Sequence, residues 1–439
     1  MRVEGGRPCA LCARETPDEA LAEAGWIDAE VERRLTAEHP GWRRPDGACP
    51  ACVQQALLVV LLEKGDAALH AGVQRSWPLD AEAAFGALPT PLRLHADPRF
   101  TGRGVTLALV DAAFFPHSDL VQPRNRIRAW ADASQALVTE RSFSPGETPE
   151  WPGWEARDGG QWHGLMTSAA AAGNGHLGHG LYRGLAPDAD LVLVQVRDAD
   201  GRITNASIAR ALAWLRENGP DLGVKVVNLS LGGEPVSPLR GNAVDDAVED
   251  LVEAGTTVVV AAGNDAVRSL VPPGTAPAAL TIGGLDDRNT LDHAARALWH
   301  SNYGGTDDGA VKPELVAPSL WVVAPVLPGT GLAREASELF ARRARGDGGA
   351  DSRIGDLKLV TPHYQHVEGT SFASPLTASA VACMLEACPS LTPDQIRQSL
   401  VATAEPVAGV ARERQGAGAL HAGRAVMAAL ERGTAVPTP

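Results

Sequence analysis

Residues 104–114 read GVTLALVDAAF, an apolar run that ends in Asp111. Its branched and aliphatic side chains predict a buried strand over Val105–Val110. Similar apolar runs predict further strands at Leu191–Val196, Val224–Leu229, Thr256–Val260 and Leu280–Gly283. Amphipathic patterns predict helices at Ile203–Glu217 and Ala243–Glu253. Strands that alternate with helices need right-handed crossovers. The sequence therefore predicts an α/β fold with a mostly parallel central sheet.

Length and composition limit the classes of protein. The chain has 439 residues, which allows about three domains of ~150 residues or one large domain with a small appendage. With 44% hydrophobic residues it can bury a sizeable core, which excludes a wholly disordered chain. Its 39 Lys and Arg residues against 53 Asp and Glu residues give a net charge of −14, which opposes binding to nucleic acid or anionic lipid.

Hydropathy and cysteine usage address the cellular location. The longest apolar run, Ala56–Leu62, is far shorter than the ~20 residues that span a bilayer. The first residues, MRVEGGRPCALC, lack the apolar core and cleavage site of a secretory signal. Six cysteines are too few for a disulfide-stapled secreted scaffold. We therefore expect a cytoplasmic protein with no membrane contact.

Four of the cysteines form two C-x-x-C pairs, Cys9 with Cys12 and Cys49 with Cys52. Two such pairs supply the four thiolates of a closed structural zinc site. His39 is a lesser candidate ligand. A redox-active dithiol and two unrelated cysteine pairs are the alternatives. A closed zinc site would be structural and would take no part in catalysis.

The N-terminal region differs in its sequence pattern from the rest of the chain. A capping box at Thr16-Pro17-Asp18-Glu19 predicts a helix through the low 20s, and further helices are predicted at about Asp28–Ala37 and Ala51–Lys64. We expect a four-cysteine, zinc-binding-like module over residues 1–75, a linker or lead-in over 76–103, a large α/β domain over 104–432 and a tail over 433–439.

Four polar residues lie in short motifs that carry chemistry. Asp111 ends a predicted strand, His163 opens the helix HGLMTSAAAAG, Asn264 follows the strand VVVAAGND, and Ser371 lies in GTSFASP at the start of an apolar helix. Acyl transfer needs a nucleophilic hydroxyl, a base, a carboxylate that orients the base, and a donor to the developing oxyanion. These four residues supply one of each.

These motifs resemble the subtilisin-like serine proteases, the subtilases of the S8 peptidase family. The order Asp, His, Ser is that of the family, and GTSFASP and AAGN are similar to its nucleophile and oxyanion segments. VVNLSLGG (Val226–Gly233) resembles its substrate-pairing strand, and PPGTAPAALTIGG (Pro272–Gly284) resembles the wall of its specificity pocket. The resemblance covers about Gly104–Arg432.

The resemblance implies a three-layer fold and a serine endopeptidase. Asp111, His163 and Ser371 would form the triad, and Asn264 would line the oxyanion hole. An extended polypeptide substrate would pair with four consecutive residues: Ser230, Leu231, Gly232 and Gly233. Calcium is common in the family, but no ligand cluster stands out in this sequence.

Other interpretations of the sequence stay open. One is a catalytically silent or gated protein of the same fold that regulates a partner bound by its N-terminal zinc module. Nucleic-acid binding by the module is the weakest, because residues 1–75 hold 9 Lys and Arg against 12 Asp and Glu. Four tryptophans at 130, 151, 154 and 162 favour a packed surface loop, and Leu332–Arg345 predicts a basic helix with a solvated face. Cys383 and Cys388 are expected to be buried thiols.

Overall fold

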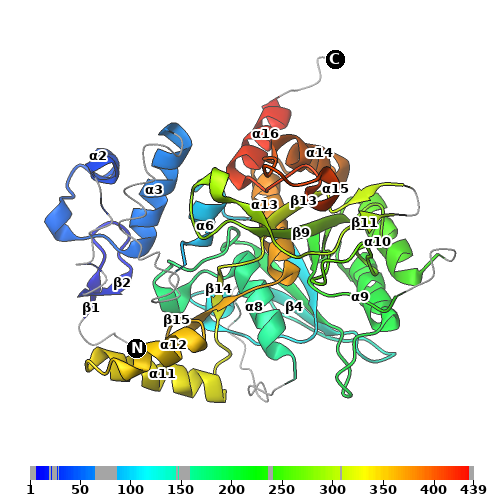
Figure 1. Cartoon of the computed structure of the whole chain (residues 1–439), viewed down its shortest axis with the longest axis horizontal. Coiled ribbons are helices and arrows are strands. Elements are labelled where there is room, and N and C mark those ends of the chain that lie inside the picture. The colour runs from blue at the N-terminus through cyan, green and yellow to red at the C-terminus, as the bar shows by residue number, and fades with distance from the viewer. Residues whose placement is uncertain are drawn as a thin grey trace.

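A computed structural model of the chain shows a large sheet between layers of helices, with a small N-terminal module beside it (Figure 1). The structure describes residues 6–18, 21, 27, 29–64, 87–144, 147, 159–235, 241–306 and 309–434. Among these residues, no helix is long and apolar enough to cross a bilayer.

The central sheet has nine strands. Their order is β10-β9-β8-β7-β3-β6-β4-β5, and β13 also pairs with β9. The strands are β3 (Thr106–Asp111), β4 (Ile127–Asp132), β5 (Thr139–Ser142), β6 (Asp190–Gln195), β7 (Val224–Leu229), β8 (Thr257–Ala261), β9 (Leu280–Asp286), β10 (Ala297–Leu298) and β13 (Leu315–Pro318). Only the pairs β4–β5 and β9–β10 are antiparallel, so the predicted mostly parallel sheet is confirmed.

Helices cover both faces of this sheet. In β3, Leu107 and Leu109 pack in one apolar cluster, while Ala108 and Val110 pack in another on the opposite face. The first cluster includes residues of α8 (Gln161–Ala172), α13 (Thr370–Ala387) and α16 (Ala422–Thr434), and the second includes residues of α9 (Asn205–Asn218) and α10 (Ala243–Glu253). Alternate side chains of a strand point to opposite faces. The predicted three-layer α/β fold is therefore confirmed (Figure 1).

Further elements surround these layers. They are α6 (Thr90–Arg93), α7 (Ser118–Val121), η4 (His176–Gly178), η5 (His293–Ala295), β11 (Gly304–Gly305), β12 (Val311–Lys312), β14 (Val322–Pro325), α11 (Gly331–Ala344), α12 (Gly349–Asp356), β15 (Leu359–Thr361), β16 (Tyr364–Val367), α14 (Pro393–Thr403) and α15 (Arg412–Gln415). The predicted basic helix is α11, and it packs with α12 around Ala336 and Leu339. Arg342 and Arg343 of α11 pair with Asp347 and Asp351, and both arginines are exposed.

Two local predictions are wrong. Trp130 lies inside β4, where it is buried and packs edge-on against Phe114 at 5.9 Å between ring centroids. Trp162 lies on α8, so neither belongs to a surface loop; Trp151 and Trp154 fall outside the described residues. Thr16 does not cap a helix, because it lies in a strand and its hydroxyl donates to the carbonyl of Arg14. The helix expected through the low 20s falls mostly outside the described residues, of which Asp18 and Leu21 are helical.

The N-terminal module consists of a short hairpin followed by helices. Its elements are β1 (Gly6–Pro8), β2 (Glu15–Pro17), α2 (Ala29–Glu38), η2 (Arg44–Asp46) and α3 (Pro50–Lys64). The expected helices at Asp28–Ala37 and Ala51–Lys64 correspond to α2 and α3, although residue 28 is outside the described set. The apolar face of α3 packs in one cluster with Leu88, Leu92, Leu181 and Leu291. The module thus shares a core with the large domain.

Residues 87–98 are buried between these two parts. The guanidinium of Arg93 makes two hydrogen bonds of 2.8 Å to the carboxylate of Asp287, and both side chains are almost fully buried. It also donates to the carbonyls of Leu320 (2.6 Å) and Trp321 (2.5 Å). A buried carboxylate needs such partners, because an uncompensated buried charge is costly.

We expect Arg93→Met to lower the free energy of unfolding by about 3–5 kcal/mol, because Asp287 would stay buried without its partner. Urea unfolding followed by tryptophan fluorescence measures this. Arg103→Met is the matched control: Arg103 is 76% exposed and pairs with Asp188, so its loss should cost at most about 1 kcal/mol. Equal losses in the two variants would contradict the expectation.

Candidate active site and candidate metal centre

Polar side chains gather beyond the carboxyl ends of the central strands. Asp111 is the last residue of β3, Ser230 follows β7, and Asn264 lies three residues beyond the end of β8. These strands are neighbours in the order β8-β7-β3, and they run parallel. Sites in open parallel sheets form at this edge.

The carboxylate of Asp111 is held by three donors. Its Oδ1 lies 2.6 Å from Nδ1 of His163 and accepts the backbone N–H of Ala112 at 2.6 Å. Its Oδ2 accepts the hydroxyl of Thr167 at 2.8 Å. The Asp111 side chain is 2% exposed, so these contacts replace its hydration and fix the orientation of the imidazole.

Helix α8 can approach β3 this closely because residue 164 is glycine. A β-carbon at Gly164 would lie 2.0 Å from the carbonyl oxygen of Ala113, which no real side chain tolerates. His163 and Thr167 are four residues apart on α8 and so lie on the same side of the helix. The close approach brings both side chains to Asp111.

The charge of Asp111 also changes the acidity of His163. Burial of the imidazole disfavours its charged form, but the Asp111 carboxylate and the hydrogen bond to it outweigh burial, so the pKa of His163 lies above its ordinary value. The carboxylate therefore makes the imidazole a better proton acceptor.

Ser371 lies in the first turn of α13, after the N-cap residue Gly369. The hydroxyl of Ser371 donates to the carbonyl of Ser230 at 3.3 Å, and the hydroxyl of Ser230 donates to the carbonyl of Ser371 at 2.8 Å. The ring of Phe372 lies 6.2 Å from the imidazole of His163, centroid to centroid. The start of α13 thus faces the Asp111–His163 pair.

Asn264 is fixed by the residue that precedes Ser371. Its Oδ1 accepts the backbone N–H of Thr370 at 3.0 Å and the hydroxyl of Thr370 at 2.8 Å. Because the amide oxygen is engaged, the amide nitrogen is the group left to donate. A β-carbon at Gly369 would lie 3.6 Å from this nitrogen, so the nitrogen lies close to the start of α13.

A cavity of about 550 Å³ opens beside the Asp111–His163 pair. Its lining residues are Asp111, Ala112, Gly160, Trp162, His163, Arg197, Ile203, Ser230, Leu231 and Gly232. Three of the four residues expected to pair with substrate thus line it. Gly233 is not among them, and its N–H donates to the carbonyl of Pro272 at 2.7 Å.

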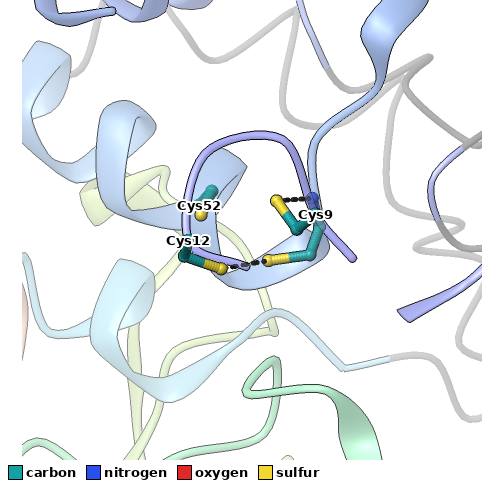
Figure 2. A group of neighbouring side chains, drawn as sticks. Cys9, Cys12 and Cys52 are labelled. Atoms are coloured by element: carbon teal, nitrogen blue, oxygen red, sulfur yellow. Dashed lines mark hydrogen bonds between the residues drawn. The ribbon is translucent and has the colours of Figure 1, made fainter. Parts of the chain in front are cut away.

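The four paired cysteines come together in the N-terminal module. The sulfur atoms of Cys9, Cys12, Cys49 and Cys52 all lie within 4.8 Å of one another, and all four thiols are free. Figure 2 shows the side chains of Cys9, Cys12 and Cys52 converging on one point. Four thiolates around one ion at about 2.3 Å would be separated by about 3.8 Å, so this geometry fits a tetrahedral metal site.

The backbone also supports thiolate at this cluster. The N–H groups of Leu11 and Cys49 point at Sγ of Cys9, at 3.5 and 3.3 Å. Hydrogen bonds from the Cys49 and Cys52 side chains lower the pKa of Cys9, whereas hydrogen bonding and burial raise the pKa of Cys52. In the described part of the chain, no other group of three or more His, Cys, Asp or Glu residues is placed to hold a metal.

Two residues that hold the site together, Thr167 and Thr370, were not predicted from the sequence. Thr167 could have been found, because it lies one helical turn after His163. Thr370 is part of the motif GTSFASP, but its hydrogen bonds to Asn264 could not be predicted. They join segments 106 residues apart, and a local sequence pattern contains no information about such a contact.

Comparisons with known proteins identify the family. The subtilase family profile matches residues 102–419. Over 309 residues the chain is 31% identical to the serine protease AprX of Bacillus subtilis (strain 168), covering 68% of this chain and 61% of that protein. It is 30% identical over 305 residues to subtilisin BL of Lederbergia lenta, covering 69% of this chain and 84% of that protein. The chain belongs to the subtilase family, as its motifs indicated.

Solved structures agree on the fold. Proteases from Pseudoalteromonas arctica match with a TM-score of 0.54 and 23% identity, over 78% of this chain and 94% of theirs. The protease domain of PatA matches with a TM-score of 0.51 and 21% identity, over 75% of this chain and 96% of that domain. The chain spans 61% of the length of AprX, so the match does not extend over that whole protein.

We expect His163 to remain protonated to a higher pH than His176, whose pKa is lowered by burial. Below the raised pKa the imidazole is charged, and above it the ring is free to accept a proton. Asp111→Asn should lower the His163 pKa, since it removes the negative charge. Histidine NMR titration, with His163→Gln for assignment, measures both. An unchanged midpoint in Asp111→Asn would contradict this account.

Proposed function

We propose that this subtilase is a serine endopeptidase that uses Asp111, His163 and Ser371 as its triad and Asn264 in its oxyanion hole. The observation that carries the proposal is the 2.6 Å contact between the buried Asp111 carboxylate and His163, at the strand ends where α13 begins with Ser371. Carboxylate, imidazole and hydroxyl in this order are the elements of nucleophilic acyl transfer.

The reaction proceeds in two halves. Ser371 Oγ leaves the Ser230 carbonyl and attacks the scissile carbonyl carbon, while His163 Nε2 takes its proton. His163 then gives this proton to the leaving amine, and an acyl-enzyme forms. Water, deprotonated by His163, hydrolyses that ester and restores Ser371. Asp111 stabilises the imidazolium in both halves and is not itself protonated.

The oxyanion of each tetrahedral intermediate would accept hydrogen bonds from the Asn264 side-chain amide and from the backbone N–H of Ser371. The bonds from Thr370 hold the Asn264 amide oxygen, so the nitrogen is preorganised for this role. The N-terminus of α13 adds a favourable dipole. A polypeptide substrate would lie extended beside Ser230–Gly233, with main-chain hydrogen bonds supplying affinity.

We expect Ser371→Ala to abolish peptide hydrolysis and labelling by a fluorophosphonate probe, because the proposed mechanism uses the Ser371 hydroxyl as its nucleophile. Asn264→Ala should keep labelling but lower kcat by about 10²–10³-fold. Gel fluorescence and peptide hydrolysis measure these effects, with thermal midpoints confirming that each variant folds. Near-normal hydrolysis by Ser371→Ala would overturn the proposal, and a folded wild type that neither labels nor hydrolyses would favour a silent regulator.

We propose that the Cys9, Cys12, Cys49 and Cys52 cluster holds a structural zinc ion. A closed tetrahedral site of four thiolates suits zinc, and the four free thiols lie within 4.8 Å of one another, near the separation of about 3.8 Å in such a site. A tetrathiolate site carries negative charge when metallated. The cavity beside it is lined by Cys12 and Cys52 together with one carboxylate, Asp188, and four arginines, Arg14, Arg124, Arg126 and Arg183, so its net positive charge would offset that of the site.

The position of the module bears on whether it gates the active site. Gln54 of α3 donates to the carbonyl of Leu181 at 3.1 Å and accepts from Arg183 at 3.2 Å. These partners lie between the end of α8 and the start of β6, whereas His163 is near the beginning of α8, about 14 Å from the end of that helix. We therefore propose that the module stabilises the enzyme or recruits a protein partner, rather than covering the cleft.

We expect about one zinc ion per purified chain, and a lower thermal midpoint after removal by a chelator, because α3 shares an apolar cluster with the large domain. Elemental analysis and differential scanning fluorimetry measure this. Cys12→Ser should lose the metal, while the control Cys388→Ser, a buried free thiol at the end of α13, should keep it. Zinc retained at full occupancy by Cys12→Ser would contradict the site.

We also propose a reducing location such as the cytoplasm. The six cysteines all carry free thiols, including the two buried ones at the end of α13, Cys383 and Cys388. Reducing compartments keep thiols in this state, and zinc thiolates depend on it.

A further inference from the structure

Arg197 places a positive charge in the cavity that holds Asp111 and His163. It lies two residues beyond the end of β6, and its backbone N–H donates to the carbonyl of Ala112 at 3.1 Å. Its Nε donates to the carbonyl of Gly201 at 3.0 Å. The side chain is therefore anchored at one end, next to the residue that follows the catalytic carboxylate.

Most N–H donors of the Arg197 guanidinium are not used in hydrogen bonds to described residues. Arginine carries five N–H donors, and in the described part of the chain only Nε of Arg197 has a hydrogen-bond acceptor. No described carboxylate forms an ion pair with it. The neighbouring acids Asp198 and Asp200 pair with Arg202 instead, and the cavity's own carboxylate, Asp111, is bound to His163 and Thr167.

The sheet order determines which substrate side chain meets this charge. Asn264 follows β8 and Arg197 follows β6, with β7 and β3 between them, so the two residues lie on opposite sides of the strand end that would pair with substrate. Successive side chains of an extended peptide point in opposite directions. If the residue with the scissile carbonyl points toward the Asn264 side, the preceding residue points toward Arg197.

We propose that Arg197 is a specificity-determining residue that selects an acidic side chain, Asp or Glu, at the substrate position immediately before the residue that supplies the scissile carbonyl. A carboxylate there would accept a forked pair of hydrogen bonds from the guanidinium. The apolar wall formed by Ile203 and Leu231 would contact the methylene stem of the substrate side chain. This inference rests on the proposed peptidase function and deepens it.

The test uses internally quenched peptides that differ only at that position, carrying Asp, Asn or Lys. For the full-length wild type, kcat/KM should be about tenfold higher with Asp than with Asn, and lowest with Lys. The ratio should shrink as ionic strength rises. Arg197→Gln should abolish the Asp-over-Asn preference while still hydrolysing the Asn peptide, and Arg197→Glu should favour Lys. Arg202→Gln, in the same loop but paired with Asp198 and Asp200, is the matched control and should keep the preference.

Failure of this inference is distinguishable from failure of the peptidase. Hydrolysis of all three peptides at equal kcat/KM, or an acid preference that survives in Arg197→Gln, would overturn the role of Arg197 and leave the peptidase intact. If no peptide is hydrolysed, fluorescence anisotropy with Ser371→Ala and labelled forms of the same peptides still decides. Binding about tenfold tighter with Asp than with Asn supports the inference, and equal binding or none overturns it.

Discussion

The buried carboxylate of Asp111 is the constraint on which the site depends. A carboxylate can be buried at the end of β3 only if donors replace water, and here they are His163, Thr167 and the N–H of Ala112. Two of these donors belong to α8, so this helix must lie against the strand end, and Gly164 makes the approach possible. The orientation of the imidazole is thereby fixed by the folding of the core itself.

Most of the fold could be predicted from the sequence because the central strands are buried on both faces. Such strands appear as continuous apolar runs, and the predicted β7 and α10 have the bounds seen in the structure. Strand β4 escaped prediction, since IRAWAD mixes charged and apolar residues, and its neighbour β5 is exposed along its whole length. Thr16 was misassigned because a local capping pattern competes with hairpin pairing that the sequence does not reveal.

The site was predictable in its residue types but not in its supporting contacts. Asp111, Asn264 and Ser371 stand at element ends, where a change of periodicity is visible in the sequence. Thr370, by contrast, acts on Asn264 across a separation of 106 residues. The position of Arg197 could not be predicted either. In the sequence it is an ordinary polar-loop arginine, and it comes near Asp111 only because β6 lies beside β3 in the sheet. Contacts of this kind follow from topology, and only the folded structure supplies them.

The net charge of the whole chain bears on the role proposed for Arg197. A net charge of −14 repels an acidic peptide at long range, so overall electrostatics cannot select acidic substrates. That repulsion is screened beyond about 8 Å at physiological ionic strength, whereas a guanidinium in direct contact acts within a hydrogen-bond length. An acidic side chain would therefore approach without electrostatic steering and be held only once it reaches the cavity. Selectivity would then arise in the bound complex, next to His163, where contacts to the substrate can stabilise the transition state.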